Sequence, residues 1–146
     1  MSTDAIQSSA PRASHGPGRN RRRGWRAVTA LLVAAVFAEA VLAGAILSGV
    51  GWARAAHGAT AGLLIVSTAI AGLVALVTLR RVPHGARLGL TLLSLAVALL
   101  LQAVIGALTA KGGANLLWVH VPLGVALVGF AAQAVADARR LGADEA

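Results

Sequence analysis

Two histidines have the residue type and the placement to bind a metal cofactor. His57 and His120 each lie a few residues inside the start of a long apolar stretch. A histidine within a membrane helix is costly and usually has a partner, and imidazole is a common axial ligand of haem iron. If both stretches enter the membrane from the same side, the two imidazoles lie at a similar depth. The pair is interpreted as the two axial ligands of one haem; the alternative is that each histidine meets water or headgroups without a ligand.

Small residues beside both histidines would give a flat macrocycle room. Ala61 follows His57 by four residues and Gly124 follows His120 by four, so each lies on the face of its histidine. The alternative is that these small residues only let membrane helices pack closely.

Two further polar residues lie inside apolar stretches. Glu39 is the one carboxylate well inside a stretch, and Gln102 lies within another. Both side chains are long enough for a Glu39–Gln102 hydrogen bond between helices. Intramembrane carboxylates often mark proton or cation pathways, and a structural hydrogen bond is the other interpretation.

The composition places the chain in a membrane. Of its 146 residues 58% are hydrophobic and 12% charged, whereas soluble domains carry roughly 25% charged residues. Cysteine is absent, which excludes disulfides, thiolate metal sites, iron–sulfur clusters and haem attached through cysteine. A haem bound here would therefore be of the b type.

The sequence predicts an all-α membrane protein with four transmembrane helices. Each apolar stretch is about 20 residues or longer, enough to cross the bilayer. The predicted spans are residues 27–50, 55–79, 88–109 and 116–138. Short connections favour an up-down-up-down bundle over residues 25–140. Residues 1–24, rich in Ser, Pro, Gly and Arg, are predicted to be a disordered basic arm, and residues 141–146 a C-terminal tail.

The basic residues indicate the orientation. Eleven of the thirteen Lys and Arg residues fall on one side, and only Arg54 and Lys111 fall on the other. The eleven are Arg12, Arg19, Arg21, Arg22, Arg23, Arg26, Arg80, Arg81, Arg87, Arg139 and Arg140. The positive-inside rule then predicts a multi-pass plasma-membrane protein with both termini in the cytoplasm and both histidines near the outer face. The arginines are interpreted as topology signals, so no nucleic-acid partner is expected.

The stretch from Leu100 to Thr109 (LLQAVIGALT), followed by Trp118-Val119-His120, resembles one four-helix half of the haem A synthase family. The resemblance covers about residues 27–138 and includes a histidine that opens the second span. It implies a four-helix bundle in which histidines on the second and fourth helices ligate or position a haem. On this basis His57 and His120 are the expected ligands, and the segment from Gln102 to Gly106 is helix-packing context.

The chain departs from that family in ways that bear on activity. The enzyme has two such halves, and its catalytic half carries a Glu three residues before the helix-2 histidine and an Arg just after it. Here those positions are Arg54 and Gly58, so oxidation of a haem methyl group is not expected and no catalytic residue is assigned. The chain is also similar to uncharacterised small four-helix membrane proteins of actinobacteria, which implies no activity. Two copies forming a homodimer would match the enzyme's two halves.

Three functions are compatible with these residues. The first is a haem b module near the outer face, used in electron transfer, haem sensing or haem assembly, with a redox or haem-assembly partner. The second is a ligand-free accessory subunit. The third is a small proton-coupled transporter that uses Glu39, although aromatic residues, which hold cationic substrates in such proteins, make up only 3% of the chain.

Overall fold

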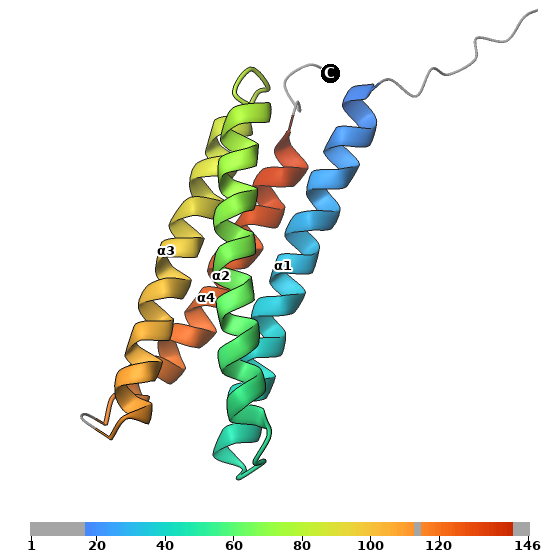
Figure 1. The fold of residues 1–146 in the computed structure, drawn as a ribbon. Helices are drawn as coiled ribbons and strands as arrows, with labels where there is room; N and C mark the ends of the chain where they lie inside the picture. The colour runs from blue at the N-terminus through green and yellow to red at the C-terminus, as the bar shows by residue number, and fades with distance from the viewer. Residues whose placement is uncertain (1–16, 113–114, 142–146) are drawn as a thin grey trace, which may run out of the picture.

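The computed structural model describes residues 17–112 and 115–141, which form four α-helices lying side by side (Figure 1). The helices are α1 (Pro17–Leu47), α2 (Ala53–Thr78), α3 (Gly85–Ala110) and α4 (Leu117–Arg140). The described residues contain no strand. All four helices are long and apolar enough to cross a membrane. The prediction of an all-helical protein with four membrane-length helices is therefore confirmed.

The helix ends gather at two ends of the bundle. The α1–α2 turn lies at one end with the end of α3 and the start of α4, and the α2–α3 turn lies at the other with the start of α1 and the end of α4 (Figure 1). Helix α1 packs against α2 and α4, and α3 packs against the same two helices. Thus α1 lies diagonal to α3, and α2 lies diagonal to α4.

Helix α1 begins earlier than its apolar stretch. Residues 17–24, expected to be disordered, are helical, whereas residues 1–16 of the predicted arm lie outside the described residues. Proline suits the first position of a helix, and arginine is a good helix former. With 31 residues the helix is about 46 Å long, more than the roughly 30 Å of bilayer hydrocarbon. Its arginine-rich first turns therefore extend beyond the apolar part.

Glycines bring α2 and α3 into close contact. A Cβ atom on Gly72 would lie 2.9 Å from the Leu93 side chain, and one on Gly89 would lie 2.6 Å from that of Leu76. A Cβ atom on Gly85 would collide with the carbonyl oxygen of Leu79 across the α2–α3 turn. These two helices therefore depend on bare backbone at the contact, as close-packed membrane helices commonly do.

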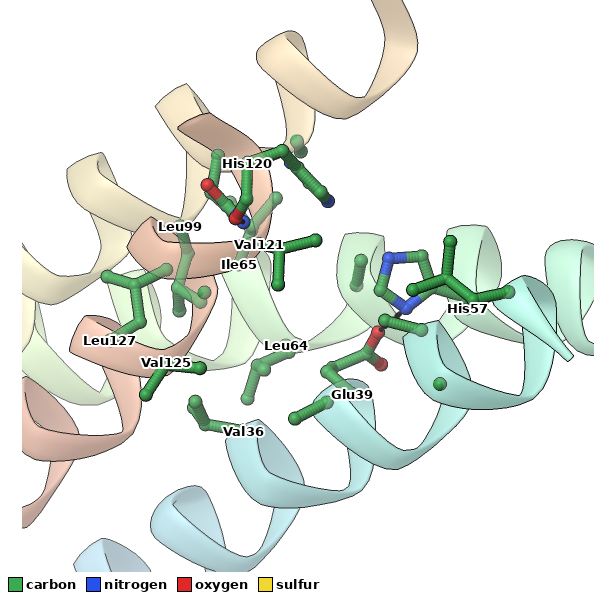
Figure 2. A pocket seen from close by; sticks show the side chains of 18 residues that line it. Val36, Glu39, His57, Leu64, Ile65, Leu99, His120, Val121, Val125 and Leu127 are labelled. Atoms are coloured by element: carbon green, nitrogen blue, oxygen red, sulfur yellow. Dashed lines mark hydrogen bonds and ion pairs between the residues drawn. The ribbon is translucent and has the colours of Figure 1, made fainter. Parts of the chain in front are cut away.

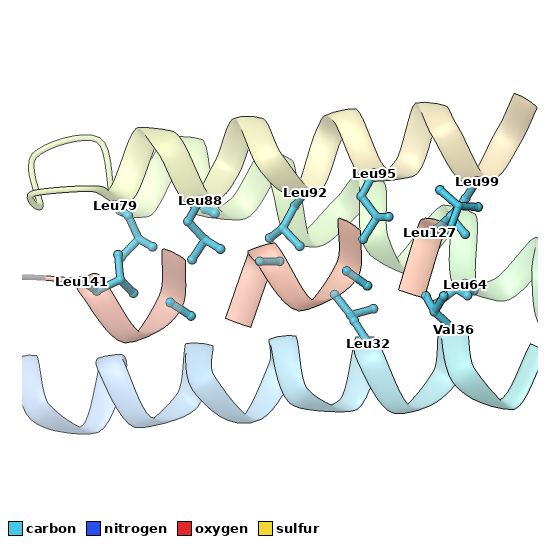
Figure 3. Packing of buried hydrophobic residues seen from close by; sticks show 14 residues of the cluster. Leu32, Val36, Leu64, Leu79, Leu88, Leu92, Leu95, Leu99, Leu127 and Leu141 are labelled. Carbon is cyan, nitrogen blue, oxygen red and sulfur yellow. The ribbon is translucent and has the colours of Figure 1, made fainter. Parts of the chain in front are cut away.

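A ridge of leucines fills the interior (Figure 3). On α3 the ridge consists of Leu88, Leu92, Leu95 and Leu99, whose spacing of three and four residues puts them on one helix face. Many other apolar side chains point outward, and Leu31, for example, is 70% exposed. Such a surface suits lipid and not water.

Candidate functional site

A cavity of about 230 Å³ lies within the bundle and is lined by all four polar residues singled out in the sequence (Figure 2). These are Glu39 on α1, His57 on α2, Gln102 on α3 and His120 on α4. The remaining lining residues are aliphatic or glycine. The four helices thus bring four polar side chains to one apolar space.

The helix periodicity explains why these side chains meet. Gln102 follows Leu99 by three residues, so it continues the leucine ridge of α3. Glu39 follows the buried Val36 of α1 at the same spacing. His57 follows the buried Ala53 by four residues. His120 precedes the buried Leu127 of α4 by seven residues, which is about two helical turns. Each polar residue thus lies on the core-facing side of its helix, and together they form a polar layer.

Glu39 and His57 form one close polar contact in this layer. The Nδ1 atom of His57 lies 2.6 Å from the Oε2 atom of Glu39, and the two side chains are 25% and 13% exposed. Both atoms are buried, and neither has a well-aligned hydrogen bond to any group in the described parts of the chain. Each therefore depends on the other for electrostatic compensation. The carboxylate engages one imidazole nitrogen and leaves Nε2, on the far side of the ring, for another partner (Figure 2).

Gln102 holds the backbone of His120. Its Nε2 atom donates a hydrogen bond of 2.6 Å to the His120 carbonyl oxygen. Two glycines make room for this arrangement. A Cβ atom on Gly124 would lie 3.1 Å from Gln102 Nε2, and one on Gly106 would lie 2.8 Å from Cε1 of the His120 ring. Helix α3 thus positions both the main chain and the imidazole of His120.

The expected Glu39–Gln102 hydrogen bond is replaced by these two contacts. Glu39 pairs with His57, and Gln102 pairs with the His120 carbonyl. The two residues lie on α1 and α3, which are diagonal in the bundle, whereas α1 and α2 are neighbours, as are α3 and α4. The similar depth of Glu39 and Gln102 within their apolar stretches therefore did not identify the partner of either residue.

Besides Glu39 Oε2 and His57 Nδ1, two further buried atoms of this layer have no hydrogen-bond partner among the described residues. They are Nδ1 of His120 and Oε1 of Gln102. An unsatisfied buried polar atom costs about 1–3 kcal/mol, so a ligand that satisfied them would be favoured. The described residues hold no group of three or more His, Cys, Asp or Glu residues that could bind a bare metal ion. A haem iron needs only two axial ligands from the protein, and imidazole is a common one.

A second polar cluster, which the sequence analysis did not identify, ties α3 to α4. The fully buried Asp137 accepts hydrogen bonds from Thr91 Oγ1 at 2.7 Å and from Gln133 Nε2 at 2.9 Å. The Nε atom of Arg87 lies 3.1 Å from its Oδ1. The spacing of four residues in Arg87/Thr91 and in Gln133/Asp137 is the signal that would have revealed it. Because its carboxylate is fully satisfied, this cluster is structural.

Among the sequence-predicted site residues, His57, His120, Glu39 and Gln102 therefore share one cavity, and their pairing is set by helix neighbourhood. No protein-family model, no curated protein and no solved structure matches the chain.

Proposed function

We propose that this chain is a small membrane protein that binds one b-type haem in the cavity, with His57 and His120 as axial ligands. The observation that carries the proposal is the convergence of two imidazoles, from the diagonal helices α2 and α4, on one apolar cavity. Ligand sites in helical bundles are built in this way, from side chains on facing helices.

The residues around the cavity fit this donor set. A metal-binding histidine normally gives its other nitrogen to a carboxylate or carbonyl, which fixes the ring and raises its basicity. Glu39 Oε2 lies 2.6 Å from Nδ1 of His57, where such a carboxylate would lie, so Nε2 would be the ligating atom. His120 is positioned by Gln102 and Gly106. When bound, a haem with two imidazole ligands supplies one-electron redox chemistry and leaves no open iron position for oxygen.

The size of the cavity sets a condition on this proposal. Its volume of about 230 Å³ is below the roughly 300–1,000 Å³ of most sites for larger small molecules. A porphyrin would therefore enter by displacing side chains such as those of Val121 and Val125, which line the cavity and are exposed at its edge. The small residues Gly44, Ala61 and Ala103 on its wall leave the backbone accessible.

The proposed membrane orientation is up-down-up-down, with both termini in the cytoplasm of a plasma-membrane protein. The end of the bundle that holds the start of α1 and the end of α4 carries most of the arginines, which supports this orientation. The cavity would then lie toward the outer face. A single haem there does not carry electrons across the bilayer, so the proposed role is electron transfer or haem assembly with a partner protein or a second copy.

The test is an absorption spectrum of the detergent-purified protein, expressed with haem supply, in its oxidised and reduced forms. We expect a Soret peak and a sharp α-band on reduction, both lost in His57→Ala and in His120→Ala. The matched control is His84→Asn, because His84 lies in the α2–α3 turn at the other end of the bundle. A colourless protein that also fails to take up added haem would refute the proposal.

The Glu39–His57 pair also favours a second candidate function, proton transfer. A carboxylate oxygen 2.6 Å from an imidazole nitrogen is close enough to exchange a proton with it, and such groups mark proton relays in membranes. However, no aromatic residue lines the cavity, so it lacks the surfaces that hold organic cations. Loss of proton-coupled efflux in Glu39→Gln, in a protein without haem, would favour this transporter function over the haem site.

A further inference from the structure

A second hollow lies between α1 and α2, away from the haem cavity. It is an open groove of about 460 Å³ lined by four residues from each helix. These are Arg21, Gly24, Trp25 and Val28 of α1 and Ser67, Ile70, Ala71 and Val74 of α2. On each helix the spacing is three to four residues, so two facing stripes form the walls. From Arg21 to Val28 the groove is about 10 Å long.

The packing of the bundle explains why the groove opens at this end. In Figure 1, α1 and α2 come together at the end where a short turn joins them and separate toward the other end. There, Gly72 and Gly89 hold α2 against α3. Helix α1 instead contacts α4 at this end, where Arg26 Nη2 donates a hydrogen bond of 3.2 Å to the Arg139 carbonyl oxygen. At this end the bundle thus consists of two pairs, α2 with α3 and α1 with α4, and the gap between the pairs lies between α1 and α2.

The chemistry of the walls excludes most polar ligands from the inside of the groove. Its one hydroxyl, on Ser67, is bonded to the Leu64 carbonyl oxygen of its own helix at 3.1 Å. The rest of the wall is apolar except at one point, where Arg21 stands exposed and makes no ion pair or hydrogen bond with any described residue. The groove therefore suits a ligand with a hydrocarbon body and a single anionic group.

The charge around this end agrees with such a ligand. Arg19 and Arg23 flank Arg21 on α1, and Arg80 and Arg81 follow the end of α2; all are exposed. Trp25, half-buried beside Arg21, is of the residue type that settles at the headgroup level of membranes. Basic pockets between transmembrane helices bind anionic lipid headgroups.

We propose that this groove is a binding site for an anionic phospholipid, with the phosphate on Arg21 and an acyl chain along the walls formed by Val28 and Val74. Guanidinium groups bind phosphate through two parallel hydrogen bonds, and one arginine near an anionic headgroup contributes about fivefold in affinity. The inference is independent of haem, because the groove shares no residue with the cavity.

The test measures quenching of Trp25 fluorescence by lipids brominated near the glycerol end of their acyl chains. Trp52→Phe and Trp118→Phe leave Trp25 as the one tryptophan; these two side chains are 67% and 75% exposed, so their replacement leaves the interior intact. The full chain is placed in nanodiscs of phosphatidylcholine. Brominated phosphatidylglycerol or brominated phosphatidylcholine is then added at equal mole fraction.

We expect phosphatidylglycerol to occupy the site about fivefold more strongly than phosphatidylcholine. Arg21→Gln should abolish this preference, whereas Arg23→Gln, on the same helix but outside the groove, should keep it. Gly24→Leu should reduce the preference by filling the groove, because no atom lies within 4 Å of a Cβ placed at Gly24. Gly129→Leu, which is equally unobstructed but lies on α4, is its control.

Three results would overturn the inference. Equal quenching by both lipids would show that the groove does not select the headgroup. If the preference for phosphatidylglycerol survives in Arg21→Gln, it arises from the general charge of the arginine cluster and not from Arg21. Absence of quenching at Trp25, in a sample where a lone Trp52 is quenched, would show that protein and not lipid covers the groove.

Discussion

The Oε2 atom of Glu39 on α1 lies 2.6 Å from Nδ1 of His57 on α2, although the sequence had suggested a hydrogen bond between Glu39 and Gln102. Because of this contact, the Glu39 carboxylate is not isolated within the bundle but holds the imidazole of His57 in place. The predicted haem ligand and the predicted proton-pathway residue are therefore parts of one pair. Changing Glu39 should affect whatever His57 does.

Replacement of Glu39 should weaken haem binding without removing a ligand. Loss of a carboxylate behind a metal-binding histidine typically costs 10–100-fold in affinity, so Glu39→Ala should fall in about that range. Glu39→Gln keeps a hydrogen-bond acceptor but removes the charge, so it should bind more tightly than Glu39→Ala. The midpoint potential of the haem should rise in Glu39→Gln, because the wild-type carboxylate is a nearby anion that stabilises the oxidised iron and this variant lacks it. Haem titration and redox potentiometry measure both effects; unchanged values in both variants would separate Glu39 from the haem site.

A methyl group at Gly106 of α3 should disturb His120 on the neighbouring helix α4. The added Cβ atom would lie 2.8 Å from Cε1 of the ring, closer than real contacts allow, so the imidazole must move. Gly106→Ala should therefore lose haem while the helix remains folded. Gly129→Ala on α4 has open space and should bind haem normally, with stability unchanged or raised by up to about 1 kcal/mol from helix propensity. Haem titration and thermal unfolding of the two variants make the comparison.

Hydropathy was sufficient to predict the four helices. A run of about 20 apolar residues in a bilayer must satisfy its backbone hydrogen bonds internally, and a helix does this within one segment. The observed α2, Ala53–Thr78, differs from the predicted 55–79 by two residues or fewer at each end. The start of α1 differed more, because arginine-rich residues 17–24 carry no apolar pattern although they favour helix.

The site residues stood out in the sequence because each is polar within an apolar span. Their pairing could not be deduced in the same way, because it depends on the rotation of each helix about its axis and on which helices are neighbours. Asp137 was missed for a related reason. It lies in the last turns of α4, where a carboxylate resembles an interfacial residue, yet its side chain is fully buried against α3.

The Asp137 cluster should contribute more to stability than any other polar group of the bundle. Asp137→Ala removes the partner of Thr91, Gln133 and Arg87 together. Loss of one member of a buried charged network costs about 3–5 kcal/mol. Arg87→Gln should cost below about 1 kcal/mol, because the Arg87 side chain is 56% exposed. Thr91→Val should cost about 0.6 kcal/mol, the average for single hydrogen bonds between membrane helices, and at most about 1.7 kcal/mol. Unfolding in mixed micelles ranks the three variants, and a ranking with Arg87→Gln first would contradict this account.

Close packing of α2 on α3 should make Gly89 intolerant of any side chain. In Gly89→Ala the new Cβ atom would meet the Leu76 side chain at 2.6 Å and the Leu76 backbone nitrogen at 2.9 Å. The side chain can rotate away, but the backbone can move only if the helices separate. We expect a loss of about 1–3 kcal/mol, as for other overpacked interiors. Gly58→Ala, on the exposed face of α2 with open space, is the control and should be neutral or slightly stabilising. Equal unfolding midpoints for both variants would show that the helices part at little cost.

The proposed orientation can be tested cleanly because the chain contains no cysteine. A single cysteine replaces Gly51, exposed in the α1–α2 turn, or Arg81, exposed in the α2–α3 turn. With both termini in the cytoplasm, a maleimide that cannot cross membranes should label Gly51→Cys in intact cells. It should label Arg81→Cys only after the membrane is opened. The reverse pattern would place the cavity lined by His57 and His120 near the cytoplasmic face. The arginine-rich end would then face outward, against the rule that such residues remain in the cytoplasm.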